Sequence, residues 1–177
     1  LVPLLVGLFS ISEILRQVEK PIRVHDTSSN VSASADAFRT LIKRPLNYLR
    51  SSTLGVFIGI LPGIGGVTAA FLSYRAAMIF KKPADPEFGD GNTDGVIASE
   101  AANSAVTGGA LIPMLALAIP GDPIVAVLMG GLMVQAIQPG PAMFLNHPEI
   151  IDGIFAVFIL GAILLLPIGL LFVRLII

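Results

Sequence analysis

The chain has 177 residues, of which 54% are hydrophobic and 13% charged, about half the charged fraction of a typical soluble domain. So few charged side chains cannot cover a protein of this size in water, which indicates that lipid or other subunits cover part of its surface. The net charge of −1 gives no basic surface for nucleic acid, and the lack of cysteine excludes disulfides, thiolate metal sites and cysteine nucleophiles.

The first two zones of the chain are an apolar segment and a polar one. Residues 1–18 are interpreted as the end of a membrane helix, too short here to span a bilayer alone. Because the chain both begins and ends in an apolar run, we expect it to be a fragment of a longer protein. Residues 19–50 include a stretch rich in serine, asparagine and alanine and are predicted to form a polar loop.

Residues 53–80 form an apolar zone that is broken at Pro62-Gly63-Ile64-Gly65-Gly66. Lysine and arginine near membrane segments prefer the cytoplasmic side, and both flanks of this zone are basic. A re-entrant hairpin that turns at the break would keep both flanks on one side, whereas a single kinked crossing helix would not. The hairpin is therefore predicted, and the crossing helix is its alternative. The flanking basic residues are Arg39, Lys43, Arg44 and Arg50 before the zone and Arg75, Lys81 and Lys82 after it.

Such a break carries a structural cost inside hydrocarbon, because unpaired backbone groups survive there only where protein or a water-filled cavity covers them. Proline removes a backbone donor, and glycine permits angles that other residues resist, so the helix is expected to stop at this point. In transporters, breaks of this kind direct helix N-termini and bare carbonyls toward solutes and ions. Glycine and proline are also common in membrane helices without such a role, which is the plainer interpretation.

Residues 95–144 form a second apolar zone, predicted as broken membrane helices with interruptions at Pro120-Gly121-Asp122-Pro123 and Pro139-Gly140-Pro141. Before it, residues 90–95 match the start of a calcium loop, but the twelfth position is Ala101, so no calcium site is expected. Asp122 is interpreted either as a residue of a coupling or substrate site or as a turn acid between two helices.

A polar face is predicted at the start of this zone. In a helix, Glu100, Asn103, Ser104 and Thr107 would share one face at spacings of three and four residues. An ionisable residue at membrane depth usually faces a cavity, a pathway or a partner. The alternative is that Glu100 lies at the membrane surface in the first turns of the helix. The small residues around it would let another backbone approach closely; they are Ala98, Ala101, Ala102, Ala105, Gly108 and Gly109.

Residues 150–177 are almost uninterrupted in their hydrophobicity and are long enough to cross about 30 Å of hydrocarbon. They are predicted to form a spanning helix, with Pro167 as a kink.

Four motifs occur in an order that resembles the large membrane subunit of the tripartite tricarboxylate transporters, the TctA family. They are Gly59–Gly66, Gly95–Ala105, Ile119–Asp122 and Gln138–Pro141. The resemblance implies multi-pass insertion in the bacterial inner membrane and two related halves, with this chain in the second half. It also implies import of carboxylates such as citrate on an ion gradient, with a periplasmic solute-binding protein and a small membrane subunit as partners. The family usually has proline before the acid and an Asn-Asn pair after it, where this chain has Ser99 and Asn103-Ser104.

The expected fold is an all-α integral membrane bundle with broken or re-entrant helices at the Pro-Gly motifs. The expected function is secondary active import of a small organic anion, with no enzyme activity, no cofactor and Na⁺ or H⁺ as the coupling ion. Two alternatives are a membrane scaffold or channel component and an intramembrane enzyme. The expected substrate-binding residues are Pro62, Gly63, Gly65, Gly66, Thr68 and Asn103, and the expected ion-coupling residues are Glu100, Ser104, Thr107, Pro120, Gly121 and Asp122.

Overall fold

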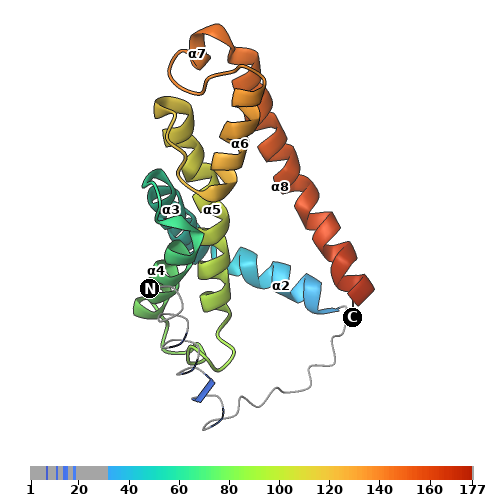
Figure 1. Ribbon diagram of the computed structural model, residues 1–177. Coiled ribbons are helices and arrows are strands. Elements are labelled where there is room, and N and C mark those ends of the chain that lie inside the picture. Colours follow the sequence, from blue (N-terminus) through green and yellow to red (C-terminus); the bar gives the residue numbers. More distant parts are fainter. Residues whose placement is uncertain (1–6, 8–10, 12–13, 16–17, 19–31, 177) are drawn as a thin grey trace. The chain divides into compact units, whose positions relative to one another are not determined.

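The computed structural model describes residues 32–176, together with Gly7, Ile11, Ile14, Leu15 and Val18, and every regular element in these residues is a helix. The chain divides into two units, Leu1–Asn30 and Val31–Ile177. The first unit contains the five separate described residues, all helical, and the rest of the segment predicted as a membrane-helix end lies outside the described residues. The second unit contains the helices α2 (Ser32–Lys43), α3 (Pro45–Ile60), α4 (Gly65–Ile79), α5 (Thr93–Leu117), α6 (Pro123–Val134), α7 (Met143–Asn146) and α8 (Pro148–Ile176) (Figure 1).

The polar loop predicted over residues 19–50 is wrong where the structure describes it. Residues 32–43 form α2 and residues 45–50 form the start of α3, while residues 19–31 lie outside the described residues. Pro45 occupies the first turn of α3, where its missing N–H and fixed φ angle suit a helix start. The polar composition of residues 32–50 is therefore that of helices and not of a loop.

The first Pro-Gly break separates α3 from α4. Leu61, which precedes a proline, is extended with φ −86° and ψ 111°, and this conformation ends α3. Gly63 and Gly65 have φ values of +81° and +74°, a region that favours glycine. The two helices contact each other and form a helical hairpin. The hairpin is therefore a feature of the fold, and its re-entry into a membrane stays a prediction.

Helix α5 packs against both arms of this hairpin, and small residues allow the approach. A Cβ atom built on Gly55 or Gly59 of α3 would lie 2.3 Å from the carbonyl oxygen of Ala102 or Val106 of α5. A Cβ atom on Gly109 would lie 2.3 Å from the carbonyl oxygen of Val56. The predicted close approach at this small-residue stretch is therefore present at Ala102 and Gly109, whereas Gly108 faces open space.

The second break lies between α5 and α6. Helix α5 ends at Leu117, and Ala118 adopts a left-handed conformation with φ 57°. Helix α6 begins at Pro123, and Asp122 caps it by accepting a hydrogen bond of 2.8 Å from the Val125 N–H. The Pro-Gly motifs at residues 62–66, 120–123 and 139–141 thus all lie at junctions between successive helices, as their composition predicts.

Beyond the second break, an apolar cluster joins α5 to α6, α7 and the start of α8. Its buried members are Ala110, Leu111, Met114, Leu115, Val125, Leu132, Met143, Ile151 and Ile154.

Helix α8 has an apolar stretch, Pro148–Phe172, which within the described residues is the one helix long and apolar enough to span a membrane; only 6% of its hydrophobic window is buried.

Candidate functional site

The two Pro-Gly breaks meet. The backbone N–H of Gly63 in the first break donates a hydrogen bond of 3.1 Å to the carbonyl oxygen of Gly121 in the second. Gly121 is buried, and a Cβ atom there would lie 2.6 Å from the Gly59 carbonyl oxygen and 2.7 Å from the Ala110 Cβ. Only glycine fits at position 121 without a shift of the surrounding backbone, so the junction depends on a residue with no side chain.

The first turn of α4 lies beside Asn103 of α5. A Cβ atom on Gly66 would come within 2.2 Å of the Asn103 Oδ1 atom, so the amide occupies the space that a side chain at 66 would need. The Ile64 N-cap provides no side-chain hydrogen bond to the first turn. The Thr68 hydroxyl, expected to bind substrate, donates to the Ile64 carbonyl oxygen at 3.1 Å and is used within the helix. The first backbone N–H groups of α4 are therefore uncapped next to an amide.

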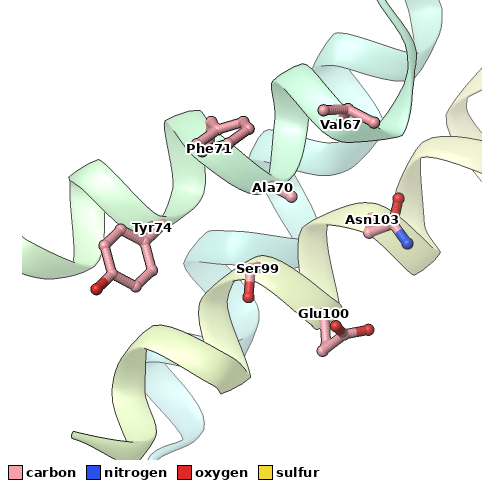
Figure 2. Close-up of a pocket in the computed structure, with 7 residues that line it drawn as sticks. All are labelled: Val67, Ala70, Phe71, Tyr74, Ser99, Glu100 and Asn103. Atoms are coloured by element: carbon pink, nitrogen blue, oxygen red, sulfur yellow. The ribbon is translucent and has the colours of Figure 1, made fainter. Parts of the chain in front are cut away.

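A hollow of about 370 Å³ lies between α4 and α5, and we call it the α4–α5 hollow. Figure 2 shows Val67 and Asn103 toward one end of it and Tyr74 toward the other. Helix α4 contributes a mainly apolar and aromatic wall, and α5 contributes polar side chains. The lining residues are Val67, Ala70, Phe71 and Tyr74 from α4 and Ser99, Glu100 and Asn103 from α5.

A second hollow of about 580 Å³ lies on another side of α5, and we call it the α3–α5 hollow. It is lined by Leu41 of α2, Tyr48 and Ser52 of α3, and Val96, Ile97, Glu100, Ala101, Ser104 and Ala105 of α5. Glu100 lines both hollows, whereas Asn103 faces one and Ser104 the other. The predicted polar face is therefore on one helix but is divided between two sides of it. Thr107, half-buried, lines neither.

Among the residues expected at the second break, Asp122 acts as the helix cap described above. This is the turn-acid alternative of the sequence interpretation, and the cap uses its Oδ1 atom. Pro120 is half-buried beside it. The Gly121 carbonyl oxygen accepts the hydrogen bond from the Gly63 N–H, and this hydrogen bond joins the two breaks.

A charged network at the other end of the hairpin was not predicted from the sequence. Arg44 donates two hydrogen bonds to the Asp85 carboxylate at 2.6 and 2.7 Å and one to the Asp94 carboxylate at 2.8 Å. The Asn47 amide donates to the backbone and side-chain oxygens of Asp94 at 3.0 and 3.1 Å. The hydrogen bond from Arg44 lowers the pKa of Asp85, and the same bond raises the pKa of Arg44.

Arg50 extends this network toward the end of α4. Its guanidinium donates to the Asn47 Oδ1 atom at 2.7 Å and lies 4.5 Å from the centroid of the Phe80 ring. The beginning of α3 and the end of α4, the two basic flanks of the hairpin, thus lie side by side. Arg44 lies 41 residues before Asp85 and 50 residues before Asp94 in the sequence. No local sequence pattern connects residues so far apart, so the sequence alone did not indicate these ion pairs.

No group of three or more histidine, cysteine, aspartate or glutamate residues that could hold a metal ion occurs in the part of the chain that the structure describes. In the stretch that resembles a calcium loop, Asn92 caps α5 by accepting from the Asp94 N–H at 2.9 Å. The Asp94 carboxylate is bound by Arg44 and Asn47. Asn92 and Asp94 therefore stabilise the first turn of α5 through these hydrogen bonds.

Comparison with known proteins gives one family. A family model described as the Tripartite tricarboxylate transporter TctA family matches residues 1–177. A protein of Agrobacterium vitis, named as an uncharacterized 52.8 kDa protein in the TAR-I ttuC' 3' region, is 35% identical over 173 residues, which are 96% of this chain and 34% of the relative. A second protein of that organism, named as an uncharacterized protein in the TAR-II ttuC' 3' region, is 39% identical over 117 residues, 66% of this chain and 48% of the relative.

The chain therefore spans about a third of the length of the first relative and about half of the second. No solved structure matches it.

Proposed function

This chain belongs to the tripartite tricarboxylate transporter TctA family, and we propose that it forms part of a secondary active transporter that imports a small di- or tricarboxylate. In this proposal, a cation gradient of Na⁺ or H⁺ drives uptake, a periplasmic solute-binding protein delivers the substrate, and a small membrane subunit completes the assembly. The protein would lie in the bacterial inner membrane as a multi-pass helical bundle, with the α3–α4 hairpin re-entrant and α8 as one of its spans.

The observation that carries the proposal is the hydrogen bond between Gly63 and Gly121. Two apolar helical segments are interrupted, and their interruptions are joined to each other. Irregular backbone at membrane depth is tolerated only where protein covers it or where it lines a cavity. Transporters build solute sites from broken helices, and the junction of two such breaks supports a transport role for this chain.

The substrate carboxylate is proposed to bind at the first turn of α4. The uncapped N–H groups there carry the partial positive charge of the helix N-terminus, which favours anions. Asn103 lies against Gly66 through its Oδ1 atom, and it would donate to the carboxylate through its NH2 group once the amide is turned over. Gly63 and Gly65 would shape the turn through their positive φ angles, and Pro62 would end the preceding helix.

The coupling cation is proposed to balance Glu100. This carboxylate lines the hollows on both sides of α5 and forms no ion pair with another described residue. An unpaired carboxylate among apolar walls is stable in a membrane when a cation or a proton accompanies it. Ser104, one turn along the helix, would assist it, while Thr107 and Asp122 would support the adjoining backbone.

The test is uptake of radiolabelled citrate and related carboxylates by the complete transporter in proteoliposomes, with the binding protein and an imposed cation gradient. Gly65→Val should abolish uptake, because valine resists the φ angle of +74° at this position, and Glu100→Ala should abolish it by removing the cation ligand. Gly108→Ala is the matched control, since a Cβ atom there meets nothing within 4 Å.

Normal uptake by both variants at equal expression would overturn the site assignment. Conduction in the absence of the binding protein would instead indicate a channel, and substrate turnover without a gradient would indicate an enzyme.

A further inference from the structure

Helix α2 is the most amphipathic among helices α2 to α6 and α8, and part of its apolar side is uncovered. Phe38 and Ile42 lie about one turn apart on it and are 56% and 62% exposed, whereas Leu41 turns inward and lines the α3–α5 hollow. Leu46, in the first turn of α3, is exposed as well. Side chains of these types are usually buried, because burial removes apolar surface from water. The exposed apolar side chains of α2 therefore favour an apolar surrounding outside the described fold.

A basic residue follows each of the two exposed apolar residues of α2. Arg39 comes directly after Phe38, and Lys43 comes directly after Ile42. Both basic side chains are exposed, and neither forms an ion pair with another residue that the structure describes. Residues 37–43 contain no acidic residue that could neutralise them. The exposed side of α2 thus combines apolar surface with uncompensated positive charge.

The length and composition of α2 indicate that it does not cross a membrane. A helix of 12 residues is about 18 Å long, and the hydrocarbon core of a bilayer is about 30 Å thick. Its average hydrophobicity is also far below that of α8. A strongly amphipathic helix of low average hydrophobicity, with lysine and arginine beside its apolar face, is typical of helices that lie in the membrane–water interface.

The junction with α3 places the end of α2 at the charged network. Helix α2 ends at Lys43, and the next residue, Arg44, leaves the helical conformation with φ −121° and ψ 45°. The Arg44 guanidinium is bound to the carboxylates of Asp85 and Asp94. Such a group of charged side chains is costly in hydrocarbon and suits the headgroup region or water. Helix α2 therefore adjoins the end of the hairpin that suits the membrane surface.

We propose that α2 lies in the membrane–water interface and binds anionic phospholipids. Phe38 and Ile42 would contact the acyl chains, and Arg39 and Lys43 would bind the lipid phosphates. An anionic lipid matches this face because one molecule carries both an apolar chain and a negative charge. A protein partner matches it less well, since the centres of protein interfaces are depleted of charged residues.

This inference rests on the membrane location in the proposed function and goes beyond it, because it concerns neither the solute nor the coupling ion. Bound lipid would hold α2 at the membrane surface. Through the junction at Arg44, α2 would then fix the depth at which the α3–α4 hairpin begins.

The test is site-specific photocross-linking in the complete transporter, reconstituted in vesicles of phosphatidylethanolamine and phosphatidylglycerol. The photoreactive residue p-benzoylphenylalanine replaces Phe38, so the position keeps an aromatic side chain. Phospholipid adducts are expected by mass spectrometry, with phosphatidylglycerol enriched several-fold over its share of the vesicle. Adding Arg39→Gln and Lys43→Gln together should abolish this enrichment. The matched control is the exchange Arg39→Lys with Lys43→Arg, which keeps both charges and should keep the enrichment.

Adducts formed only with protein, whether this chain, a second copy or another subunit, would overturn the inference. So would lipid adducts whose headgroup preference is the same with and without the two basic residues. If either result came from a transporter that still imports carboxylate, the proposed function would stand. Failure of uptake under every imposed cation gradient, with charge-dependent lipid adducts present, would count against the proposed function and leave the lipid site supported.

Discussion

The two ends of the α3–α4 hairpin are joined to the rest of the fold by different chemistry. At the end where α3 begins, Arg44 binds two carboxylates, Asp85 and Asp94. At the end where α3 stops, the contact is one backbone hydrogen bond between Gly63 and Gly121, and no described charged side chain takes part in it. We call these the charged base and the glycine tip. A charged base suits contact with water, and an uncharged tip suits a place inside the membrane.

The difference also indicates which end is adjustable. The partners at the charged base are side chains, which re-form their bonds after a small backbone shift. The partners at the glycine tip are main-chain groups packed with no space for a Cβ atom at Gly121. Because these main-chain groups cannot re-form their contact around an added side chain, substitutions at the tip should cost more than substitutions at the base.

The largest effect is expected from Gly121→Ala at the glycine tip. The added Cβ atom would lie 2.6 Å from the Gly59 carbonyl oxygen and 2.8 Å from the Ala110 Cα, so backbone must move. We expect a loss of about 1–3 kcal/mol in stability and at least about a tenfold loss of uptake. Thermal denaturation in detergent measures the loss of stability, and an uptake assay in proteoliposomes measures the loss of transport. Gly131→Ala, where a Cβ atom meets nothing within 4 Å, is the control and should keep both values. Equal behaviour of the two variants would show that the tip is not tightly packed.

A smaller effect is expected from Gly66→Ala beside the tip, because the obstacle there is a side chain. The new Cβ atom would displace the Asn103 amide, whose Oδ1 atom lies 2.2 Å from that position. We expect uptake to need a several-fold higher carboxylate concentration for half-maximal rate. Adding Asn103→Ala should restore the thermal stability of the single variant but not its apparent affinity, and a double-mutant cycle measures this coupling. Additive effects on stability would contradict the contact.

The smallest effect is expected at the charged base, and it depends on pH. The hydrogen bond from Arg44 lowers the pKa of Asp85 below its ordinary value of 3.8. A carboxylate with a lowered pKa in the folded state contributes stability above the unfolded value and loses this contribution as the pH falls through the folded value. We expect Asp85→Asn to lower the thermal midpoint by a few degrees at neutral pH. The difference from the wild type should shrink as the pH falls below about 4.

The control at the charged base is Asp90→Asn, because Asp90 is exposed and makes no ion pair among the described residues. Its midpoint should follow that of the wild type at every pH. A difference between Asp85→Asn and the wild type that stays constant down to pH 3 would show that the ion pair does not stabilise the base.

The sequence predicted the interruptions of the helices well, because their causes are local. Proline restricts the residue before it, and Leu61 is extended as this rule requires. The small-residue stretch predicted a close helix contact, and Ala102 and Gly109 form one with α3. The all-helical character of the described residues and the apolar span in α8 also follow from local composition.

The parts that were missed depend on contacts between residues distant in sequence. Arg44 reaches Asp85 and Asp94 across 41 and 50 residues, and no spacing rule connects them. Residues 32–50 form helices although their composition predicts a polar loop, because a helix with one polar face has the composition of such a loop. The division of the face at Glu100 between two hollows also depends on where α3 and α4 lie around α5.

Cross-linking of the two breaks tests the central claim most directly. The chain contains no cysteine, so Pro62→Cys and Pro120→Cys can be introduced as a pair without background from this chain. They flank the Gly63–Gly121 hydrogen bond, whereas a control pair of Pro62→Cys and Glu87→Cys has one cysteine before α4 and the other in the segment after it. We predict that a short thiol cross-linker joins the first pair in native membranes, that it leaves the control pair unlinked, and that the link stops uptake until it is cleaved. Failure to cross-link the first pair in a transporter that still imports carboxylate would contradict the account, as would a cross-link that leaves uptake unchanged.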